Sequence, residues 1–384
     1  MDPRSAVLVS AARTPMGKFG GALRDVAAVD LGAVAVREAL DRAANPSVDQ
    51  VYLANVVQAG NGQNPARSAG VRGGVARTVP ATTLNDVCIA SMTATGLAAT
   101  QIRAGEIDSA VVGGFDSMSR ALHGVQLRQA KRYGDAPLID LLQRDGLWCA
   151  LADEGMGPIS ERANRDHGIT RAQQDEIAAE SHARAATSTA SGRLRRELAA
   201  MPELDHDEGV RPDTTMERLA GLRAAFAADG SITAGNASQM SDAGAAGVLM
   251  AAETARAHGV TPMVEVIGRA TVAGPDVSLH TKPAAAAYAL LRRHGLTAAD
   301  IGLWEINEAF AGVVAASMAD LGIGYDVVNV NGGAIALGHP LGASGFRTIM
   351  TLAYEMADRE AEFGVATMCG GGGQGQAVLL RLPR

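Results

Sequence analysis

Aromatic side chains are scarce in this chain of 384 residues: Phe, Trp and Tyr make up only 3% of it, whereas 47% of its residues are hydrophobic. The buried cores must therefore be filled by small side chains packed closely together, because few rings are available to occupy the space. The length exceeds the usual size of one domain, and the hydrophobic content is ample for large cores. We expect two domains or one duplicated domain.

Cysteine is also rare, and the three cysteines, Cys88, Cys149 and Cys369, lie far apart in the sequence. They lack the spacing of metal ligands, and the eight histidines form no HxxxH or HxH group. This pattern favours neither a disulfide scaffold nor a zinc site. We expect a protein of a reducing compartment that binds no metal.

Long apolar runs and an excess of basic residues are absent. The longest apolar stretch, 243–252, has about ten residues, well below the roughly 20 that span a bilayer. The initial run Ala6-Val7-Leu8-Val9 is too short for the core of a signal peptide. With a formal net charge of −7, the chain has no general attraction to nucleic acid or to anionic membranes. We expect a soluble cytoplasmic protein that binds neither nucleic acid nor membrane.

Strand-like and helix-like segments alternate along the chain, which favours an α/β layered fold. The two halves also share a spacing, because Asn55 precedes Cys88 by 33 residues and Asn307 precedes His339 by 32. The reactive side chains would then lie at equivalent strand-to-helix turns, which indicates an internal duplication. We expect strands at 5–10, 51–57, 81–84, 108–113, 303–306, 327–330 and 377–380, and helices at 31–43 and 91–104.

Cys88 follows the expected strand at 81–84 and opens a helix of small residues. A thiol at a helix N-terminus experiences the positive end of the helix dipole, so we expect its pKa to fall from about 8.5 towards neutrality. Such a thiol would be a nucleophile. A buried, inert cysteine is the alternative interpretation.

Two glycine-rich segments near the C-terminus frame further reactive side chains. Residues 329–345 hold His339 among five glycines, and Cys369 is followed directly by four glycines. Glycine permits tight bends around a ligand, and its unobstructed backbone N–H groups can form an oxyanion hole. We interpret His339 as a general base or hydrogen-bond donor and Cys369 as a second reactive thiol, both suited to acyl chemistry. Turn and packing residues are the alternatives.

Asn307 follows the expected strand at 303–306 and has apolar flanks. Its side chain could hold a water molecule in a site. The alternative is that it caps the helix that follows.

Four motifs occur in a fixed order along the chain: Asn85-Asp86-Val87-Cys88, Asn307-Glu308-Ala309-Phe310, Gly338-His339-Pro340 and Cys369-Gly370-Gly371-Gly372. Together they resemble the motifs of the thiolase family, and the resemblance extends over nearly the whole chain. It implies a five-layer α-β-α-β-α fold of two similar halves, 1–265 and 266–384, with a lid region inserted at about 119–250. It also implies assembly as a homodimer or homotetramer.

The resemblance further implies ping-pong acyl transfer. His339 would activate Cys88, which takes an acyl group from acyl-CoA before free CoA leaves. Cys369 would then take the α-proton of a second acetyl-CoA for a Claisen condensation, while His339 and a water held by Asn307 stabilise the enolate. The N–H groups of Cys88 and Gly371 would receive the tetrahedral oxyanion. Coenzyme A is thus substrate and product, and no cofactor is implied.

Other positions match those that contact acyl-CoA in the family. Leu147, Met156 and Phe226 match positions around the acyl group and pantetheine, and Ser238 matches a pantetheine contact. The candidates for the CoA phosphates are basic: Arg120, Arg128, Lys131, Arg132, Arg211 and Arg223. Core packing and solvated surface charge are the alternatives.

Three departures from the family pattern bear on the substrate. Ile89-Ala90-Ser91-Met92 stands where the family has small residues, and Gly155 stands where short-chain members often carry a histidine. The segment 277–283, which contains His280 and Lys282, replaces one that lines the acyl pocket. We expect altered access, pantetheine recognition or specificity.

The favoured function is an acetyl-CoA C-acetyltransferase, which interconverts two acetyl-CoA with acetoacetyl-CoA and CoA. Tyr133-Gly134-Asp135 and Leu138-Ile139-Asp140 support it, because they resemble the hairpin of short-chain, tetrameric members. The alternative is a degradative 3-ketoacyl-CoA thiolase for longer chains. A CoA-binding protein with a decayed site is a third hypothesis, motivated by Ile89, Met92 and Gly155.

Overall fold

The computed structural model describes residues 1–128 and 133–383. Lys131 and Arg132, two of the basic residues considered for the CoA phosphates, lie outside the described residues. The strands are β1 (Ala6–Arg13), β2 (Gly17–Lys18), β3 (Gln50–Ala54), β4 (Ala81–Leu84), β5 (Ser109–Ser117), β6 (His123–Gly124), β7 (Ile139–Asp140), β8 (Trp148–Cys149), β9 (Glu154–Gly155), β10 (Ser241–Ala251), β11 (Val264–Ala273), β12 (Leu303–Ile306), β13 (Phe363–Gly370) and β14 (Gln374–Arg381).

Helices alternate with these strands, as the sequence predicts. The α-helices are α1 (Ala28–Arg42), α2 (Pro65–Arg72), α3 (Ala90–Ala104), α4 (Met156–Asp166), α5 (Arg171–Ala190), α6 (Met216–Ala220), α7 (Ala252–Ala257), α8 (Lys282–Arg293), α9 (Ala311–Leu321), α10 (Ala334–Leu337) and α11 (Leu341–Arg359). Short helical turns are η1 (Gln143–Leu147), η2 (Leu194–Glu197), η3 (Ala298–Asp300) and η4 (Tyr325–Val327). No described helix is long and apolar enough to cross a membrane.

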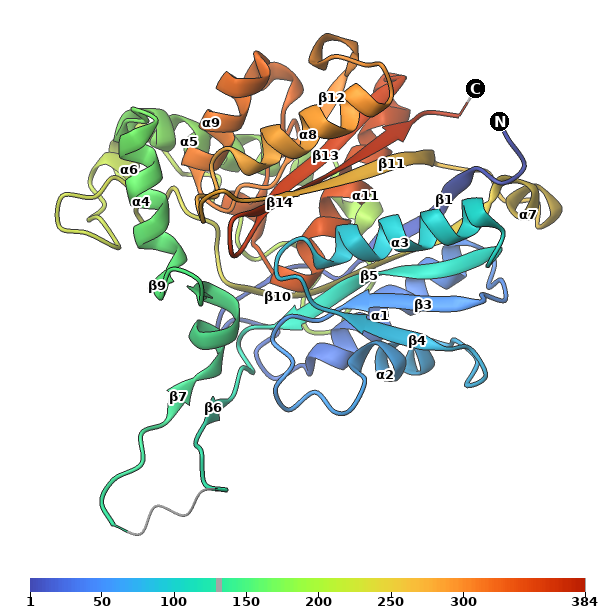
Figure 1. The fold of residues 1–384 in the computed structure, drawn as a ribbon, viewed down its shortest axis with the longest axis horizontal. Helices are drawn as coiled ribbons and strands as arrows, with labels where there is room; N and C mark the ends of the chain where they lie inside the picture. Colours follow the sequence, from blue (N-terminus) through green and yellow to red (C-terminus); the bar gives the residue numbers. More distant parts are fainter. Residues whose placement is uncertain (129–132, 384) are drawn as a thin grey trace.

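The main sheet has the strand order β12-β13-β14-β11-β1-β10-β5-β3-β4. Its two parts are joined where β1 pairs with β11, at Val7↔Glu265 and Leu8↔Val264. Figure 1 shows the two parts diverging around α3 and α11, with α1 and α2 outside one part and α8 and α9 outside the other. This arrangement has five layers, α-β-α-β-α, and confirms the predicted fold class.

The central layer depends on small side chains. Fifteen of the nineteen residues of α11 are buried, because the helix has sheet on both sides. A Cβ at Gly345 of α11 would lie 2.9 Å from the backbone nitrogen of Met92 in α3, so glycine is needed for the two helices to approach this closely. Met92 and Ile89 are themselves fully buried in the core between the helices and the strands. The scarcity of rings is thus matched by close backbone contact.

The two parts of the sheet repeat one topology. In the first part β3 pairs in parallel with β4 and β5, and in the second β12 pairs in parallel with β13 and, at Trp304, with Val328. The expected strand at 327–330 is therefore wrong, since only a single bridge forms there. η4 ends at Val327 and Asn329 has a φ of 47°, so the chain cannot stay extended. The helices α3 and α11 occupy equivalent places after these segments.

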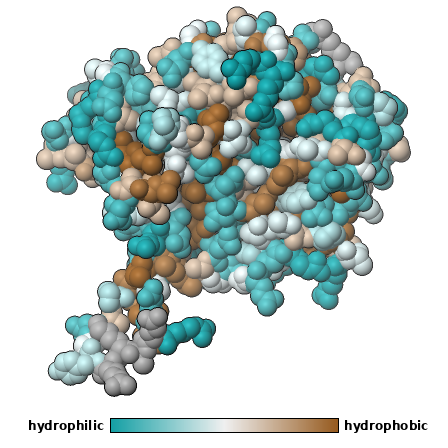
Figure 2. All heavy atoms as spheres, viewed as in Figure 1, coloured by the Kyte–Doolittle hydropathy of each residue, from teal (hydrophilic) through white to brown (hydrophobic). Residues whose placement is uncertain are grey.

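The segment between β5 and β10 is inserted between paired strands of the first part. It contains the β6–β7 hairpin, which Figure 1 shows projecting from the body, and the helices α4, α5 and α6. Leu138 of the hairpin is 66% exposed, and Figure 2 shows apolar side chains gathering where the hairpin joins the body. All eleven residues of β10 are buried in the sheet. The last residues of the region expected as a lid, from Ser241 onward, therefore belong to the sheet.

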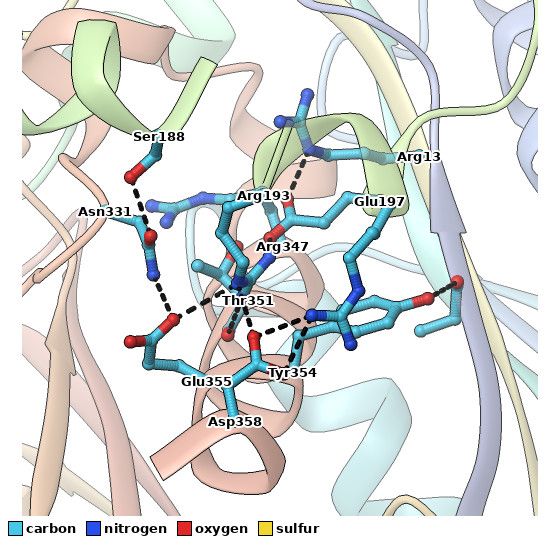
Figure 3. A network of polar contacts seen from close by, with 12 residues as sticks. Arg13, Ser188, Arg193, Glu197, Asn331, Arg347, Thr351, Tyr354, Glu355 and Asp358 are labelled. Carbon is cyan, nitrogen blue, oxygen red and sulfur yellow. Dashed lines mark hydrogen bonds and ion pairs between the residues drawn. The ribbon is translucent and has the colours of Figure 1, made fainter. Parts of the chain in front are cut away.

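A buried polar network fastens the inserted segment to α11 (Figure 3). Ser188 of α5 donates to Asn331 Oδ1, and Asn331 Nδ2 donates to Glu355 Oε2, both at 2.7 Å. Arg193 lies between Glu355 of α11 and Glu197 of η2, at 3.1 Å from each carboxylate. Removing one member of a buried ionic network costs about 3–5 kcal/mol, because its partner stays charged and unpaired. The network therefore holds α11 in a fixed position.

Candidate active site

One small cavity brings together the reactive side chains that the sequence singles out. Cys88 reaches it from the turn before α3, His339 from the turn before α11, and Cys369 from β13. The cavity has a volume of about 70 Å³ and is lined by Val87, Cys88, Gly146, Leu147, Met156, Ser238, Leu279, Ala309, Phe310, His339, Leu341, Cys369, Gly370 and Gly371. Three segments far apart in the sequence thus converge at the centre of the fold.

Cys88 sits on a strained turn. Val87 has a φ of 59°, a conformation that β-branched residues rarely adopt, and it turns the chain sharply between β4 and α3. Burial raises the pKa of the Cys88 thiol to about 12, although the backbone N–H groups of Cys88 and Gly371 favour the thiolate. The expected fall in its pKa is therefore wrong, because desolvation outweighs both N–H groups. In the free protein Cys88 is a thiol.

His339 is held in one tautomer. Ser344 Oγ donates its only proton to the carbonyl of Pro340, at 2.8 Å, so it accepts from His339 Nδ1, 2.6 Å away. Nε2 therefore carries the free lone pair, and it has no hydrogen-bond partner among the described residues. Burial, reinforced by the charge of Arg347, lowers the pKa of His339 to about 3. The imidazole is neutral and able to accept a proton.

Cys369 lies at the end of β13 and is only 1% exposed. Burial raises the pKa of this thiol well above its usual range, and the neighbouring sulfur of Cys88 raises it further. The chain then turns through Gly372 and Gly373, whose φ angles of 78° and 73° favour glycine. The turn places the N–H of Gly371 near Cys88, where it favours negative charge. A proton removed from Cys369 would leave a strong base.

Asn307 is fully buried, and neither atom of its side-chain amide has a partner among the described residues. The next helix, α9, begins at Ala311 with Phe310 as its N-cap, so helix capping is excluded as the role of Asn307. Asn307 itself is not among the residues that line the cavity, but Ala309 and Phe310 of the same turn are. An unpaired buried amide costs free energy, which points to a function for it.

The positions compared with acyl-CoA contacts divide into two groups. Leu147, Met156 and Ser238 line the cavity. Phe226 is 45% exposed and packs edge-on against Phe310, with ring centroids 6.2 Å apart. Arg211 does not line the cavity within the described part of the chain; its backbone N–H donates to His182 Nδ1 at 3.1 Å.

The departures from the family motifs lie mostly outside the cavity. Ile89 is fully buried and packs beneath Gly370, and His280 points to Asn164 Oδ1, 2.7 Å from its Nε2. Neither is among the residues that line the cavity, whereas Leu279 is. The sequence suggested that the bulky side chain of Ile89 lies near Cys88 in the site. In the structure this side chain is part of the core instead. A Cβ at Gly155 would meet Pro158 and Trp148 only at ordinary contact distances, so this position has room for a side chain.

Sequence reasoning missed two polar residues next to the site. Ser344 fixes the tautomer of His339. The sequence signal for this contact was that Ser344 follows His339 by five residues within the same glycine-rich motif. Asp116 is the penultimate residue of the apolar strand β5 and is fully buried. A single acid after such a run is a signal for a buried structural or functional carboxylate.

The fold and the cavity define a duplicated α/β protein in which two thiols and a neutral imidazole share one buried site. Models of two thiolase domains match the chain, the N-terminal domain at residues 6–253 and the C-terminal domain at 260–382. The chain belongs to the thiolase family.

Individual relatives span essentially the whole chain. It is similar to a "probable acetyl-CoA acetyltransferase" of Mycolicibacterium smegmatis, 44% identical over 387 residues that cover 98% of this chain and 100% of the relative. An "acetyl-CoA acetyltransferase" of Escherichia coli is 42% identical, covering 98% of this chain and 99% of the relative. One of Cupriavidus necator is 41% identical, covering 97% and 98%.

Proposed function

We propose that the protein is an acetyl-CoA C-acetyltransferase, which interconverts two acetyl-CoA with acetoacetyl-CoA and CoA. The observation that carries the proposal is the convergence of Cys88, His339 and Cys369 on one buried cavity. The names of the relatives agree with it. No resident cofactor is needed, because coenzyme A is itself substrate and product.

In the first half of the reaction, Cys88 gives its thiol proton to Nε2 of His339 as its sulfur attacks the carbonyl carbon of acetyl-CoA. The N–H groups of Cys88 and Gly371 face the sulfur, and we expect them to stabilise the tetrahedral oxyanion that forms beside it. The bond from carbon to the CoA sulfur then breaks, and the departing sulfur takes a proton from Cys369. Acetyl-Cys88, an imidazolium and the Cys369 thiolate remain.

In the second half, the Cys369 thiolate removes the α-proton of a second acetyl-CoA. Burial raises the pKa of this thiol, which makes its thiolate a strong base for a carbon acid. The imidazolium of His339 and a water held by Asn307 stabilise the enolate oxygen. The carbanion then forms a bond to the acetyl carbon, and the sulfur of Cys88 leaves and recovers its proton from His339. All three side chains return to their starting states.

The size of the cavity favours a short acyl group. Its volume is only about 70 Å³, whereas pockets for drug-sized ligands span about 300–1,000 Å³. Leu147, Met156 and Ser238 line it and are proposed to contact the acyl group and pantetheine, with Phe226 against Phe310 at the rim. Arg211 remains a proposal for the CoA phosphates, and it would act outside the cavity.

The proposal also covers the domain organisation, the assembly and the location of the protein. We propose two thiolase halves, 1–265 and 266–384, and a lid inserted from about 119; the pairing of β11 with β14 favours a division just before Val264. We propose a homodimer or homotetramer, supported by the open edge of β4 and by the exposed apolar side chains of the β6–β7 hairpin. The three free cysteines support a reducing, cytoplasmic location.

Two measurements test the function. Mass spectrometry of the intact protein after mixing with acetyl-CoA should show one added acetyl group, and C88S should form no thioester. Thiolysis should be fastest with acetoacetyl-CoA among 3-ketoacyl-CoA substrates of increasing length. A preference for long chains would indicate a degradative thiolase instead, and a folded protein that gains no acetyl group would indicate a CoA-binding protein.

A further inference from the structure

The repeated topology gives Cys369 a counterpart in the first half. Ala54 of β3 is opposite Gly114 of β5, just as Ile306 of β12 is opposite Thr367 of β13. Two residues beyond each of these partners, at the penultimate position of the equivalent strand, lies Asp116 in the first half and Cys369 in the second. Cys369 lines the cavity, whereas Asp116 is fully buried outside it.

The carboxylate of Asp116 is shared between the two halves. Its Oδ1 accepts from Asn55 Nδ2 at 2.7 Å and from the N–H groups of Val56 and Val57 at 3.0 and 2.9 Å. Its Oδ2 accepts from the N–H of Gly342 at 2.6 Å. The first three donors belong to the loop after β3, and the fourth belongs to the first turn of α11. One side chain therefore joins the first half to the helix that begins beside His339.

α11 has no side-chain cap of its own. Its N-cap residue is Pro340, which offers no oxygen or nitrogen in its side chain, so the free N–H groups of the first turn need another partner. A carboxylate is the most favourable partner there, because it also meets the positive end of the helix dipole. Asp116 supplies this cap from the other half of the chain. Losing it would release the end of α11 that determines where His339 lies.

The fit around this contact is tight. A Cβ at Gly342 would lie 3.0 Å from Asp116 Oδ2 and 3.1 Å from the carbonyl oxygens of Ala54 and Phe115. The backbone of α11 therefore rests directly on the ends of β3 and β5. Burial raises the pKa of Asp116 to about 6 even with four N–H donors, and its charge in turn raises the pKa of Cys88. The carboxylate thus acts on Cys88 through its charge and on His339 through the first turn of α11.

We propose that Asp116 is a positioning residue that sets the geometry between Cys88 and His339 by capping α11 from the opposite half of the molecule. It touches no substrate and transfers no proton. This inference rests on the proposed acyl transfer, because the geometry matters only if His339 accepts the proton of Cys88.

The test is Asp116→Asn. The amide has the same shape and keeps Oδ1, but it presents an N–H to the N–H of Gly342. We expect kcat for thiolysis of acetoacetyl-CoA to fall roughly 10²-fold, as for a misplacement of about 1 Å, while KM changes less than about twofold. The rate of acetyl-Cys88 formation should fall by the same factor, because His339 acts in that step.

Asp242→Asn is the matched control. Asp242 is equally buried on the neighbouring strand β10, but its donors among the described residues come from Ser117, Met118 and Ser119 rather than from α11. The Asp242→Asn variant should keep the wild-type kcat even if its melting temperature is lower than that of the wild type. If Asp116→Asn is folded and keeps the wild-type kcat, or if both variants lose kcat equally, the positioning role is wrong. A wild-type protein without thiolysis would instead refute the proposed function.

A second variant decides the matter if Asp116→Asn does not fold. Gly342→Ala leaves the carboxylate and the N–H in place but pushes the first turn of α11 away from the strands by a few tenths of an ångström. A loss of kcat at unchanged KM supports the positioning role, and a wild-type kcat overturns it.

Discussion

Equivalent strands of the two halves carry polar side chains at or just beyond their ends. Those of the first half are hydrogen-bonded within the protein, whereas those of the second half either have no such partner among the described residues or face the cavity. In the first half, Asn55 donates to Asp116 and to the carbonyl of Phe115, and Asp116 accepts four hydrogen bonds. In the second half, the amide of Asn307 has no partner among the described residues, and Cys369 faces the cavity. A duplicated frame therefore uses one set of strand ends for stability and leaves the other available for chemistry.

The helix N-termini differ less than the strand ends. Each half places one reactive side chain before its central helix, Cys88 before α3 and His339 before α11. A sharp local conformation precedes both, with a φ of 59° at Val87 and 121° at Gly338. Only glycine fits at Gly338, because a Cβ there would collide with Ser241 Oγ. Nucleophile and base thus come from different halves, and their relation depends on how the halves are joined.

The largest effect should follow from removing the base. His339→Asn keeps a hydrogen-bonding side chain next to Ser344 but has no titratable nitrogen, so kcat should fall roughly 10³-fold or more. Acetylation of Cys88, followed by rapid-quench mass spectrometry, should slow by a similar factor. A folded His339→Asn variant that acetylates Cys88 at the wild-type rate would show that another group accepts the proton.

The next effect should separate the two half-reactions. Cys369→Ser replaces the second thiol with a much weaker acid, so condensation and thiolysis should fall roughly 10²- to 10³-fold. Acetyl-Cys88 should still form, because CoA can leave as a thiolate without the proton of Cys369, and it should accumulate, because the α-proton is removed only afterwards. Loss of the acetyl-enzyme itself in this variant would mean that CoA cannot leave without that proton.

A paired substitution tests the contrast between the halves directly. Asn307→Ala should lower kcat roughly 10²-fold, as expected for loss of an oxyanion contact, with little change in the free energy of unfolding. Asn55→Ala should do the reverse, because it removes one of the four donors to the buried carboxylate of Asp116 and should cost about 1–3 kcal/mol of stability. Urea titration and steady-state kinetics on the same samples provide both quantities. If the two substitutions lowered kcat equally, the proposed division between a stabilising first half and a catalytic second half would be wrong.

Much of this organisation could be predicted from the sequence. The α/β alternation and the duplication follow from patterns and spacing in the sequence, and the convergence of Cys88, His339 and Cys369 was implied by the resemblance to the thiolase family. The prediction of a strand at 327–330 was wrong. The positive φ of Asn329 is a local backbone feature that residue type alone does not reveal. The pKa of Cys88 was also wrong in direction, since the helix N-terminus is visible in the sequence whereas the depth of burial is not.

The directions in which individual bulky or polar side chains point were the least predictable feature of the structure. Ile89 follows the nucleophile in sequence but packs into the core between α3 and β13, because the side chain of an adjacent residue leaves the turn in another direction. Asp116 belongs to none of the four family motifs, and its four donors come from residues 55–57 and 342. Contacts between halves depend on tertiary structure, so spacing within one half cannot predict them.

The smallest effect on rate should come from a buried imidazole outside the cavity. His280, like His339, has a ring nitrogen without a partner among the described residues, and burial lowers its pKa to about 3. Because this folded pKa lies below the ordinary value of about 6.5, the neutral ring contributes stability above that pH, which is lost as the pH falls towards 3. His280→Gln keeps a polar group near Asn164, so kcat should stay within about twofold of wild type.

The stability of His280→Gln should nevertheless depend less on pH. Relative to the wild type, its free energy of unfolding should gain about 1.4 kcal/mol for each pH unit below about 6.5, since one proton fewer must be taken up on unfolding. Urea titrations of both proteins between neutral and mildly acidic pH measure this difference. Parallel pH dependences would mean that His280 is charged in the folded protein. A large loss of kcat would mean that an unpaired polar atom acts in catalysis even away from the cavity, and the contrast between the two halves would then be one of degree.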